Sequence, residues 1–203
     1  MAFLDDWKIS LELLDRILSD RPSLRGILLG FVAEYKLEEI WFSKRPEITG
    51  FRRFDNHARQ ERGDFGFCYK GVPIVVQVKS LQKNSIKRKG EKEFEARFQC
   101  DASDCREVIL PDKSKLRTTC LVVGGFDLLA VNLFEGLGEW NFAFALAEDL
   151  PRTQCTKYTE EQRRHLLATT MRISYPLSPP FYEEPFALLD TVAKAKGGQS
   201  PCT

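Results

Sequence analysis

The first part of the chain carries apolar residues at the spacing of an amphipathic helix. Every third or fourth position is apolar over residues 4–19, at Trp7, Leu11, Leu14 and Leu18, which predicts a helix there. The sequence Asp20-Arg21-Pro22 ends this helix, because proline disrupts a helix interior. Ser23 can then cap a second helix that runs to about Phe42.

The second helix has a stripe of large apolar side chains that we expect to face the core. Its members are Leu24, Leu28, Phe31, Tyr35 and Phe42. A rotation of about 100° per residue places Glu34 and Glu38 together on one flank of this stripe. A carboxylate at the edge of a buried surface needs a partner, which is either a metal ion or one of the many arginines nearby.

The pattern changes to alternation between Gly63 and Lys79, which predicts two strands joined by a tight turn. Gln77 and Lys79 share one face of the second strand, and Val76 and Val78 share the other. A turn centred on Lys70-Gly71 would place Asp64 opposite Gln77, whereas a longer turn through Pro73 would place it opposite Lys79. Either register gathers a carboxylate, an amide and an ammonium group on one patch.

Shorter patterns predict the remaining elements. Glu91 to about Cys100 is a candidate helix with Phe94 and Phe98 facing inward, which would form a right-handed crossover to a strand around Leu121. Three stretches are interpreted as buried strands: Thr118–Gly124, Asp127–Phe134 and Trp140–Ala147. A capping box at Thr159–Gln162 predicts a helix over residues 160–172, and a last short helix is expected over residues 186–194.

A length of 203 residues and a hydrophobic content of 43% fit one domain of moderate size. We expect a single domain over residues 1–195, with a core of about 24–125, a C-terminal elaboration of about 126–195 and a flexible tail over 196–203. The N-terminus lacks the basic start and apolar core of a signal peptide, and no stretch approaches the roughly 20 apolar residues that span a bilayer. The expectation is a cytoplasmic protein with no membrane contact.

Positive charge is concentrated around the predicted hairpin, although the whole chain has a net charge of only +1. Residues 43–92 hold 13 Lys and Arg against 5 Asp and Glu, so this stretch carries +8 and the rest of the chain −7. Such asymmetry indicates a polyanionic partner, with an ordinary solvated basic surface as the alternative. The residues expected to contact nucleic acid are Arg52, Arg53, Arg59, Arg62, Lys83, Lys87, Arg88 and Lys89.

The residue types available point to a hard cation rather than to zinc. The six cysteines form no Cys-x-x-Cys pair, and the chain has only two histidines, of which His57 is interpreted as a surface residue rather than a general base. Asp64 is a natural ligand for Mg²⁺, Gln77 offers a neutral carbonyl oxygen, and Glu34 would add a second carboxylate. Lys79 can orient or activate a water molecule and offset negative charge at a phosphorus atom.

These four residues resemble the signature of the PD-(D/E)xK nucleases, the restriction-endonuclease-like superfamily. That signature is an aspartate on one strand and Glu/Gln-x-Lys on the next, often with a glutamate on a preceding helix. Here it corresponds to Asp64, Gln77, Lys79 and Glu34, in the Gln-x-Lys form of the Mrr-like branch. Gly63 stands where the signature often has proline, and the resemblance covers about residues 24–125.

The resemblance implies an α/β fold with a restriction-endonuclease-like αβββαβ core, a central mixed sheet flanked by helices, and extra C-terminal strands and helices. It also implies a bound Mg²⁺ or Mn²⁺ ion, held by Asp64, Gln77, Glu34 and the backbone carbonyl of Val78. It favours Glu34 over Glu38 as the ligand from the helix.

The expected function is that of a divalent-metal-dependent endonuclease that hydrolyses double-stranded DNA, in restriction or defence. Residues 126–185 would then recognise sequence or build a homodimer. A Holliday-junction resolvase or a repair nuclease would use the same catalytic residues with recognition of DNA shape. Because Gln77 replaces an acidic ligand, an inactive nuclease fold that binds DNA or protein is a further alternative. A plain α/β interaction module, with Asp64 and Lys79 as a surface ion pair, is another.

Overall fold

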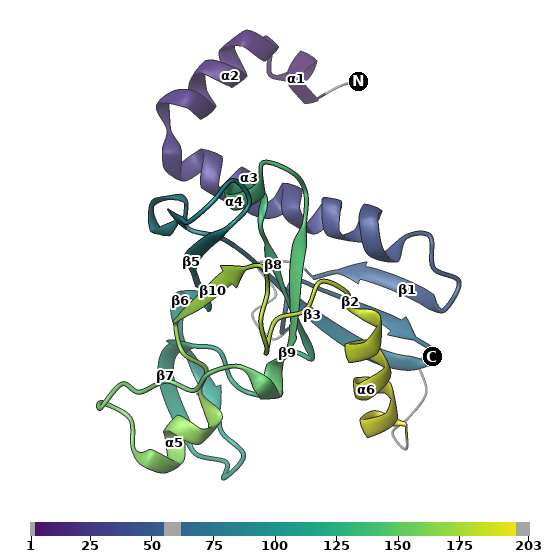
Figure 1. Cartoon of the computed structure of the whole chain (residues 1–203), viewed down its shortest axis with the longest axis vertical. Coiled ribbons are helices and arrows are strands. Elements are labelled where there is room, and N and C mark those ends of the chain that lie inside the picture. The colour runs from purple at the N-terminus through teal and green to yellow at the C-terminus, as the bar shows by residue number, and fades with distance from the viewer. Residues whose placement is uncertain (1–2, 55–61, 198–203) are drawn as a thin grey trace.

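The computed structural model describes residues 3–54 and 62–197 and has a mixed α/β fold (Figure 1). Its central sheet has the strand order β1-β2-β3-β8-β9. These strands are β1 (Ile48–Arg53), β2 (Phe65–Tyr69), β3 (Val72–Ser80), β8 (Leu128–Asn132) and β9 (Phe142–Leu146). Neighbouring strands run antiparallel except for β3 and β8, which are parallel. The predicted fold class, a central mixed sheet flanked by helices, is confirmed.

The β2–β3 hairpin has the shorter of the two predicted turns. Tyr69 pairs with Val72 and Phe65 pairs with Val76, so the next position outward puts Asp64 opposite Gln77. Lys70 and Gly71 have φ angles of 49° and 79°, as the two-residue turn that matches the strand twist requires. The turn centred on these two residues is therefore confirmed, and the alternative through Pro73 is wrong.

Helices cover one face of the central sheet. Helix α3 (Pro22–Leu37) continues into the π-helical turn η1 (Glu38–Phe42), and α6 (Phe186–Lys196) packs on the same face, confirming the last predicted helix. Ala33, Leu37 and Phe42 are buried there, together with Leu189 of α6. Helix α3 begins at Pro22 rather than after a Ser23 cap, because the fixed φ angle of proline suits the first helical turn.

A second sheet, ordered β10-β5-β4, covers the opposite face in place of the predicted crossover helix. It consists of β4 (Lys87–Arg88), β5 (Phe94–Gln99) and β10 (Thr170–Tyr175). The prediction of a helix from Glu91 to Cys100 is therefore wrong. Phe94 and Phe98 share a face in a helix and in a strand alike, whereas Ala96, which is buried with them, fits only the strand.

The chain passes from β3 to β8 through strands. It runs through the 3₁₀ turn η2 (Lys83–Ser85), β4 and β5, then through a separate hairpin of β6 (Asp101–Ile109) and β7 (Lys115–Cys120). The parallel neighbour of β3 is β8 rather than a strand around Leu121, so that part of the prediction is wrong. The predicted strands over residues 127–134 and 140–147 are confirmed by β8 and β9.

The last third of the chain has short elements. Helix α4 (Phe134–Leu137) and the 3₁₀ turn η3 (Ala147–Asp149) flank β9. Helix α5 (Glu160–His165) has the predicted capping box, in which Thr159 and Gln162 bond to each other's backbone N–H. The helix ends sooner than predicted, because Leu166 and Leu167 are buried in bridges to neighbouring extended segments and lead into β10.

The N-terminal helices project away from the central sheet (Figure 1). The predicted helix over residues 4–19 is two helices, α1 (Phe3–Asp6) and α2 (Leu11–Asp20), and neither contains a buried residue. Four members of the predicted stripe, Leu24, Leu28, Phe31 and Tyr35, are 41–59% exposed, so the expectation that they face the core is wrong. Among the described residues, no helix has the length and apolar character needed to cross a bilayer.

Candidate functional site

A groove of about 1630 Å³ lies between α3, the end of β3 and the second sheet. Four of the predicted site residues line it: Glu34, Asp64, Val78 and Lys79. Glu34 lies on the last turns of α3, Asp64 immediately precedes β2, and Val78 and Lys79 are near the end of β3. The fold therefore brings the predicted aspartate, lysine and helix glutamate to one surface.

Asp64 is held by the strand opposite it. Its Oδ2 accepts a hydrogen bond of 2.5 Å from the Val78 N–H and another from the Gln77 side-chain amide, while no described residue donates to Oδ1. Burial raises the pKa of the Asp64 carboxyl, against the opposing effects of the Lys79 charge and these two hydrogen bonds. A carboxylate in this desolvated position gains from a bound cation.

The residue before Asp64 has to be glycine in this fold. Gly63 has a φ angle of +79°, and a Cβ atom there would lie 2.6 Å from Val75 Cγ1 and 2.8 Å from the Val76 carbonyl oxygen. Proline, which the nuclease signature often has here, fixes φ near −65° and could not follow this path. The departure from the signature is therefore a requirement of the backbone that delivers Asp64 to the groove.

Gln77 supports Asp64 from within the sheet. Its side chain is only 6% exposed and does not line the groove. Because the amide nitrogen donates to Asp64, the amide oxygen points away from that carboxylate. The oxygen could face Asp64 only after rotation of the amide, and two opposed oxygens need a cation between them. In the observed orientation, the Gln77 side chain supports Asp64, and its oxygen could reach a cation beside Asp64 only after the amide rotates.

Glu34 and Glu38 have different surroundings. Glu38 forms an ion pair with Arg53, whose guanidinium stacks over the Tyr35 ring at 3.7 Å from the centroid. Glu34 lines the groove, and its pKa is raised to about 7 by burial and by the negative charge of Asp64, with smaller opposing effects of Arg53 and Lys79. The salt bridge that was the alternative for these glutamates is therefore formed by Glu38, and Glu34 lies with Asp64.

Lys79 is positioned by a backbone atom of β6. Its Nζ donates to the carbonyl oxygen of Asp101 at 3.0 Å, and its charge lowers the pKa of both Glu34 and Asp64. The role of Asp101 has no sequence signal, because any residue type supplies a carbonyl. Burial raises the pKa of the adjacent Cys100 to about 12, so this thiol stays protonated and is not a nucleophile at neutral pH.

Glu34 and Asp64 could supply two carboxylates to a hard cation such as Mg²⁺ or Mn²⁺. Among the described residues, no group of three or more His, Cys, Asp or Glu side chains is arranged to hold a metal ion, so a cation here would have only these two side-chain carboxylates. Mg²⁺ is usually held by one or two protein carboxylates and keeps several of its waters. The two carboxylates crowd one desolvated patch, where a cation would relieve their repulsion.

Two of the predicted nucleic-acid contacts, Lys83 and Lys87, line this groove. Arg62 and Arg88 are exposed but are not part of its lining. Three side chains have acidic partners: Arg53 with Glu38, Lys83 with Glu135 at 3.9 Å, and Lys89 with Glu95 at 2.5 Å. Arg52 lies on β1, with its guanidinium 5.6 Å from the centroid of the Phe54 ring. Arg59 and His57 lie outside the described residues.

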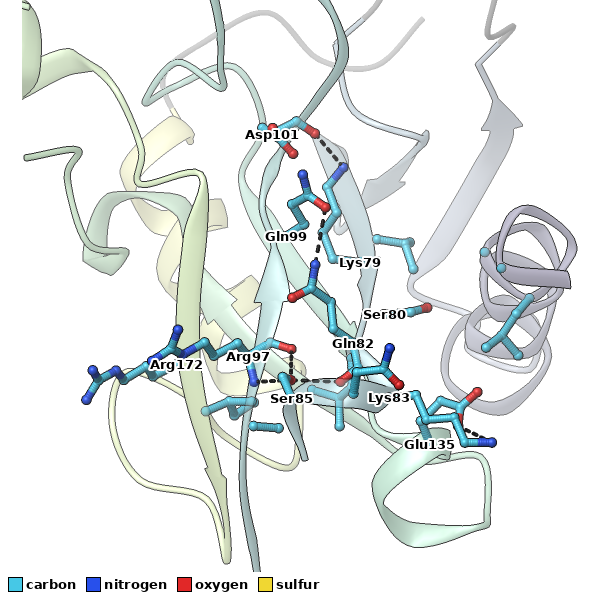
Figure 2. Close-up of a pocket in the computed structure, with 18 of the residues that line it drawn as sticks. Lys79, Ser80, Gln82, Lys83, Ser85, Arg97, Gln99, Asp101, Glu135 and Arg172 are labelled. Carbon is cyan, nitrogen blue, oxygen red and sulfur yellow. Dashed lines mark hydrogen bonds and ion pairs between the residues drawn. The ribbon is translucent and has the colours of Figure 1, made fainter. Parts of the chain in front are cut away.

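Two arginines of the groove, Arg97 and Arg172, were missed by the sequence patterns (Figure 2). They belong to β5 and β10, far apart in the chain, and neither lies in a basic run. An interpretation of residues 94–99 as a strand would have placed Arg97 on the outer face. The pairing of Arg97 with Arg172 is a tertiary contact, for which one sequence carries no signal.

A comparison with solved structures finds a bacterial homing endonuclease, I-Ssp6803I, with 14% sequence identity and a TM-score of 0.39, over 87% of this chain and 96% of that one. No family model and no curated protein matches the chain. Similarity this remote assigns no function to any residue, so the chemistry of the groove has to come from its own side chains.

Proposed function

We propose that this chain is a divalent-metal-dependent endonuclease that hydrolyses phosphodiester bonds in double-stranded DNA. The observation that supports it is the meeting of Glu34, Asp64 and Lys79 on one open groove. Phosphodiester hydrolysis needs a cation at the scissile phosphate, an oriented water molecule and a positive group near the developing charge. Glu34 and Asp64 can bind the cation, and the fixed ammonium group of Lys79 can orient the water molecule and offset the developing charge.

Glu34 and Asp64 would hold Mg²⁺ or Mn²⁺, with the Val78 carbonyl and the Gln77 oxygen as further donors. When bound, the ion supplies Lewis-acid polarisation of the phosphate. Lys79, fixed by the Asp101 carbonyl, orients the attacking water and offsets negative charge at phosphorus. Asp64 keeps its position through the Val78 N–H, so little reorganisation is needed as charge develops.

The size of the groove favours a polymeric substrate. Its volume of about 1630 Å³ exceeds the roughly 300–1,000 Å³ of typical small-molecule pockets. Lys83, Lys87, Arg97 and Arg172 line it along with the carboxylates, and basic side chains are the groups that bind a nucleic-acid backbone. A DNA duplex matches both properties.

Two variants of this function use the same residues. A restriction or defence enzyme needs recognition of base sequence, whereas a junction resolvase or repair nuclease needs recognition of DNA shape. An inactive nuclease fold is favoured by one observation, the buried Gln77 amide that donates to Asp64 where an acidic ligand would bind metal.

One set of assays tests the proposal. Supercoiled plasmid, a linear duplex and a four-way junction are incubated with the protein and Mg²⁺ or Mn²⁺, and in parallel with EDTA. We expect nicked or linear plasmid with either metal and none with EDTA. Preferential cleavage of the junction would indicate a resolvase. Salt-sensitive DNA binding without cleavage would indicate the inactive fold, and absence of both would contradict any role on DNA.

A further inference from the structure

The second sheet presents a polar face to the groove. Phe94, Ala96 and Phe98 of β5 are buried, so Glu95, Arg97 and Gln99 point outward. The same alternation in β10 buries Met171 and Ile173 and turns Thr170, Arg172 and Ser174 outward. One side of these strands belongs to the core, and the other is free to meet a ligand.

The register of β5 and β10 places two arginines directly opposite each other. Arg97 pairs with Arg172, Gln99 with Thr170 and Glu95 with Ser174. Like charges at directly opposed positions destabilise a sheet, because their Cβ atoms are only about 4.5–5.5 Å apart. No described carboxylate forms an ion pair with either guanidinium, and Glu95 is paired with Lys89 instead. Glu95, whose pKa is lowered mainly by Lys89 and to a smaller extent by the Arg172 charge, offsets part of this repulsion, and both guanidinium groups remain available to an external acceptor.

This polar face continues to the site of Lys79. Figure 2 shows Gln99 next to Lys79, with Gln82 beside it, and Arg97 and Arg172 further along the same groove. Gln82 donates to Gln99 at 3.3 Å. Ser85 bonds to both backbone groups of Arg97, at 2.8 Å to its N–H and 2.9 Å to its carbonyl, which fixes the strand that carries the arginine. Two arginines and two amides thus extend from a rigid surface.

We propose that the β5–β10 face reads base edges in the DNA major groove, with Arg97 and Arg172 as the residues that determine sequence preference. This inference rests on the proposed function, since it concerns the same DNA. The major groove, about 12 Å wide, admits a two-stranded β-ribbon. Arginine bonds in bidentate fashion to guanine O6 and N7, and glutamine to adenine. Gln99 shares the outward face of β5 with Arg97, so this face offers neutral amide donors and acceptors for base edges in addition to positive charge.

The test is selection of duplexes from a randomised library by the wild-type chain, followed by affinity measurements on the enriched sequence and on an unrelated duplex. We expect Arg97→Gln and Arg172→Gln each to weaken binding of the enriched sequence by about 10- to 100-fold, and binding of the unrelated duplex by less than about 3-fold. Their melting temperatures should equal or exceed that of the wild type, because a repulsive pair is removed. Arg117→Gln, on the exposed part of β7 outside the groove, is the matched control.

Equal weakening on both duplexes would mean that the arginines contact phosphates only, and would overturn the inference. DNA binding or cleavage by the wild-type chain with no enriched sequence would overturn it as well, while leaving the nuclease proposal intact. If the wild-type chain neither binds nor cleaves any duplex, both the base-reading inference and the proposed function are contradicted.

A separate observation concerns the apolar surface of the N-terminal helices. Six large side chains between residues 7 and 35 are 41–69% exposed and do not line the groove: Trp7, Leu11, Leu24, Leu28, Phe31 and Tyr35. At roughly 100 Å² of exposed surface each, they amount to roughly 600 Å². That equals the upper end of the roughly 300–600 Å² of the largest patch on a typical monomer and approaches the roughly 800 Å² that each partner contributes to a standard interface.

The charges around this surface are self-complementary. Residues 3–20, which include α1 and α2, hold five acidic and two basic side chains, whereas residues 21–37 hold three basic and one acidic. In a two-fold arrangement, the acidic α2 of one protomer can lie on the basic α3 of the other. The symmetry repeats this contact, so opposite charges meet at two places in the dimer. We infer that a second copy of this chain covers the exposed stripe of Leu24, Leu28, Phe31 and Tyr35.

Sedimentation equilibrium over a range of concentrations tests this dimer. We expect the wild-type chain to have twice the monomer mass. Leu28→Glu and Phe31→Glu should sediment as monomers, and their circular dichroism spectra should show that they are folded. Neither residue lines the groove. Ile109→Glu is the control, because Ile109 is also 56% exposed but lies on β6. A monomeric wild type would overturn the inference, as would either α3 variant remaining dimeric.

Discussion

Asp64→Asn and Lys79→Met are each expected to lower the rate of DNA cleavage by about 10²- to 10³-fold, the usual effect of removing one group that stabilises developing charge. Asparagine keeps the shape of Asp64 and can still accept from the Val78 N–H, so the change removes the negative charge and little else. Methionine keeps the length of Lys79 and removes the ammonium group held by Asp101. Single-turnover cleavage of a linear duplex at saturating Mg²⁺ measures both.

The binding of DNA should separate these two variants from each other. Loss of the Asp64 charge removes repulsion from phosphate, so binding should be equal or tighter, whereas loss of the Lys79 charge should weaken binding slightly and reduce its salt dependence. Asp112→Asn and Lys115→Met are the controls, since both residues lie at the β6–β7 turn, outside the groove. Wild-type cleavage rates in either groove variant would refute the assignment of catalysis to this site.

The hairpin could be predicted from the sequence because its information is local. Gly71 with a preceding Lys70 specifies a two-residue turn, and alternation on each side then sets the register of Asp64 against Gln77. These features of the hairpin depend on interactions between near neighbours, which one chain displays directly. Helical spacing placed Glu34 and Glu38 on the same flank of their helix, and the choice of Glu34 came from the resemblance to the nuclease signature.

The rest of the groove depends on contacts between distant segments. Phe94 and Phe98 are compatible with both helical and strand periodicity, so β5 was predicted as a helix. As a consequence, the outward orientation of Arg97 was not predicted. The stripe from Leu24 to Tyr35 has the spacing of a buried surface, yet α3 turns Ala33 and Leu37 to the sheet. Periodicity shows that a face is apolar, but not which molecule covers it.

Glu34 is expected to make Mg²⁺ binding depend on pH near neutrality. Its pKa is raised to about 7 from 4.5 by burial and by the Asp64 charge, so it is mostly protonated at pH 6 and mostly ionised at pH 8. Because a carboxyl must lose its proton to bind the ion, Mg²⁺ affinity should rise about tenfold between these pH values. Calorimetric titration of the DNA-free protein with Mg²⁺ measures this change.

Ionisation of Glu34 should also lower the stability of the folded protein, although it raises the affinity for Mg²⁺. The pKa of Glu34 is higher in the folded than in the unfolded state, so between about pH 4.5 and pH 7 the folded state binds more protons and loses stability as pH rises. Glu34→Gln should therefore gain in melting temperature relative to the wild type across this window and lose most of the pH dependence of Mg²⁺ binding. Glu38→Gln is the control, because Glu38 lies one turn further along the helix and its carboxylate pairs with Arg53. If Mg²⁺ affinity in Glu34→Gln still rose tenfold between pH 6 and pH 8, the pH dependence would have to be reassigned to Asp64, whose pKa is also raised by burial.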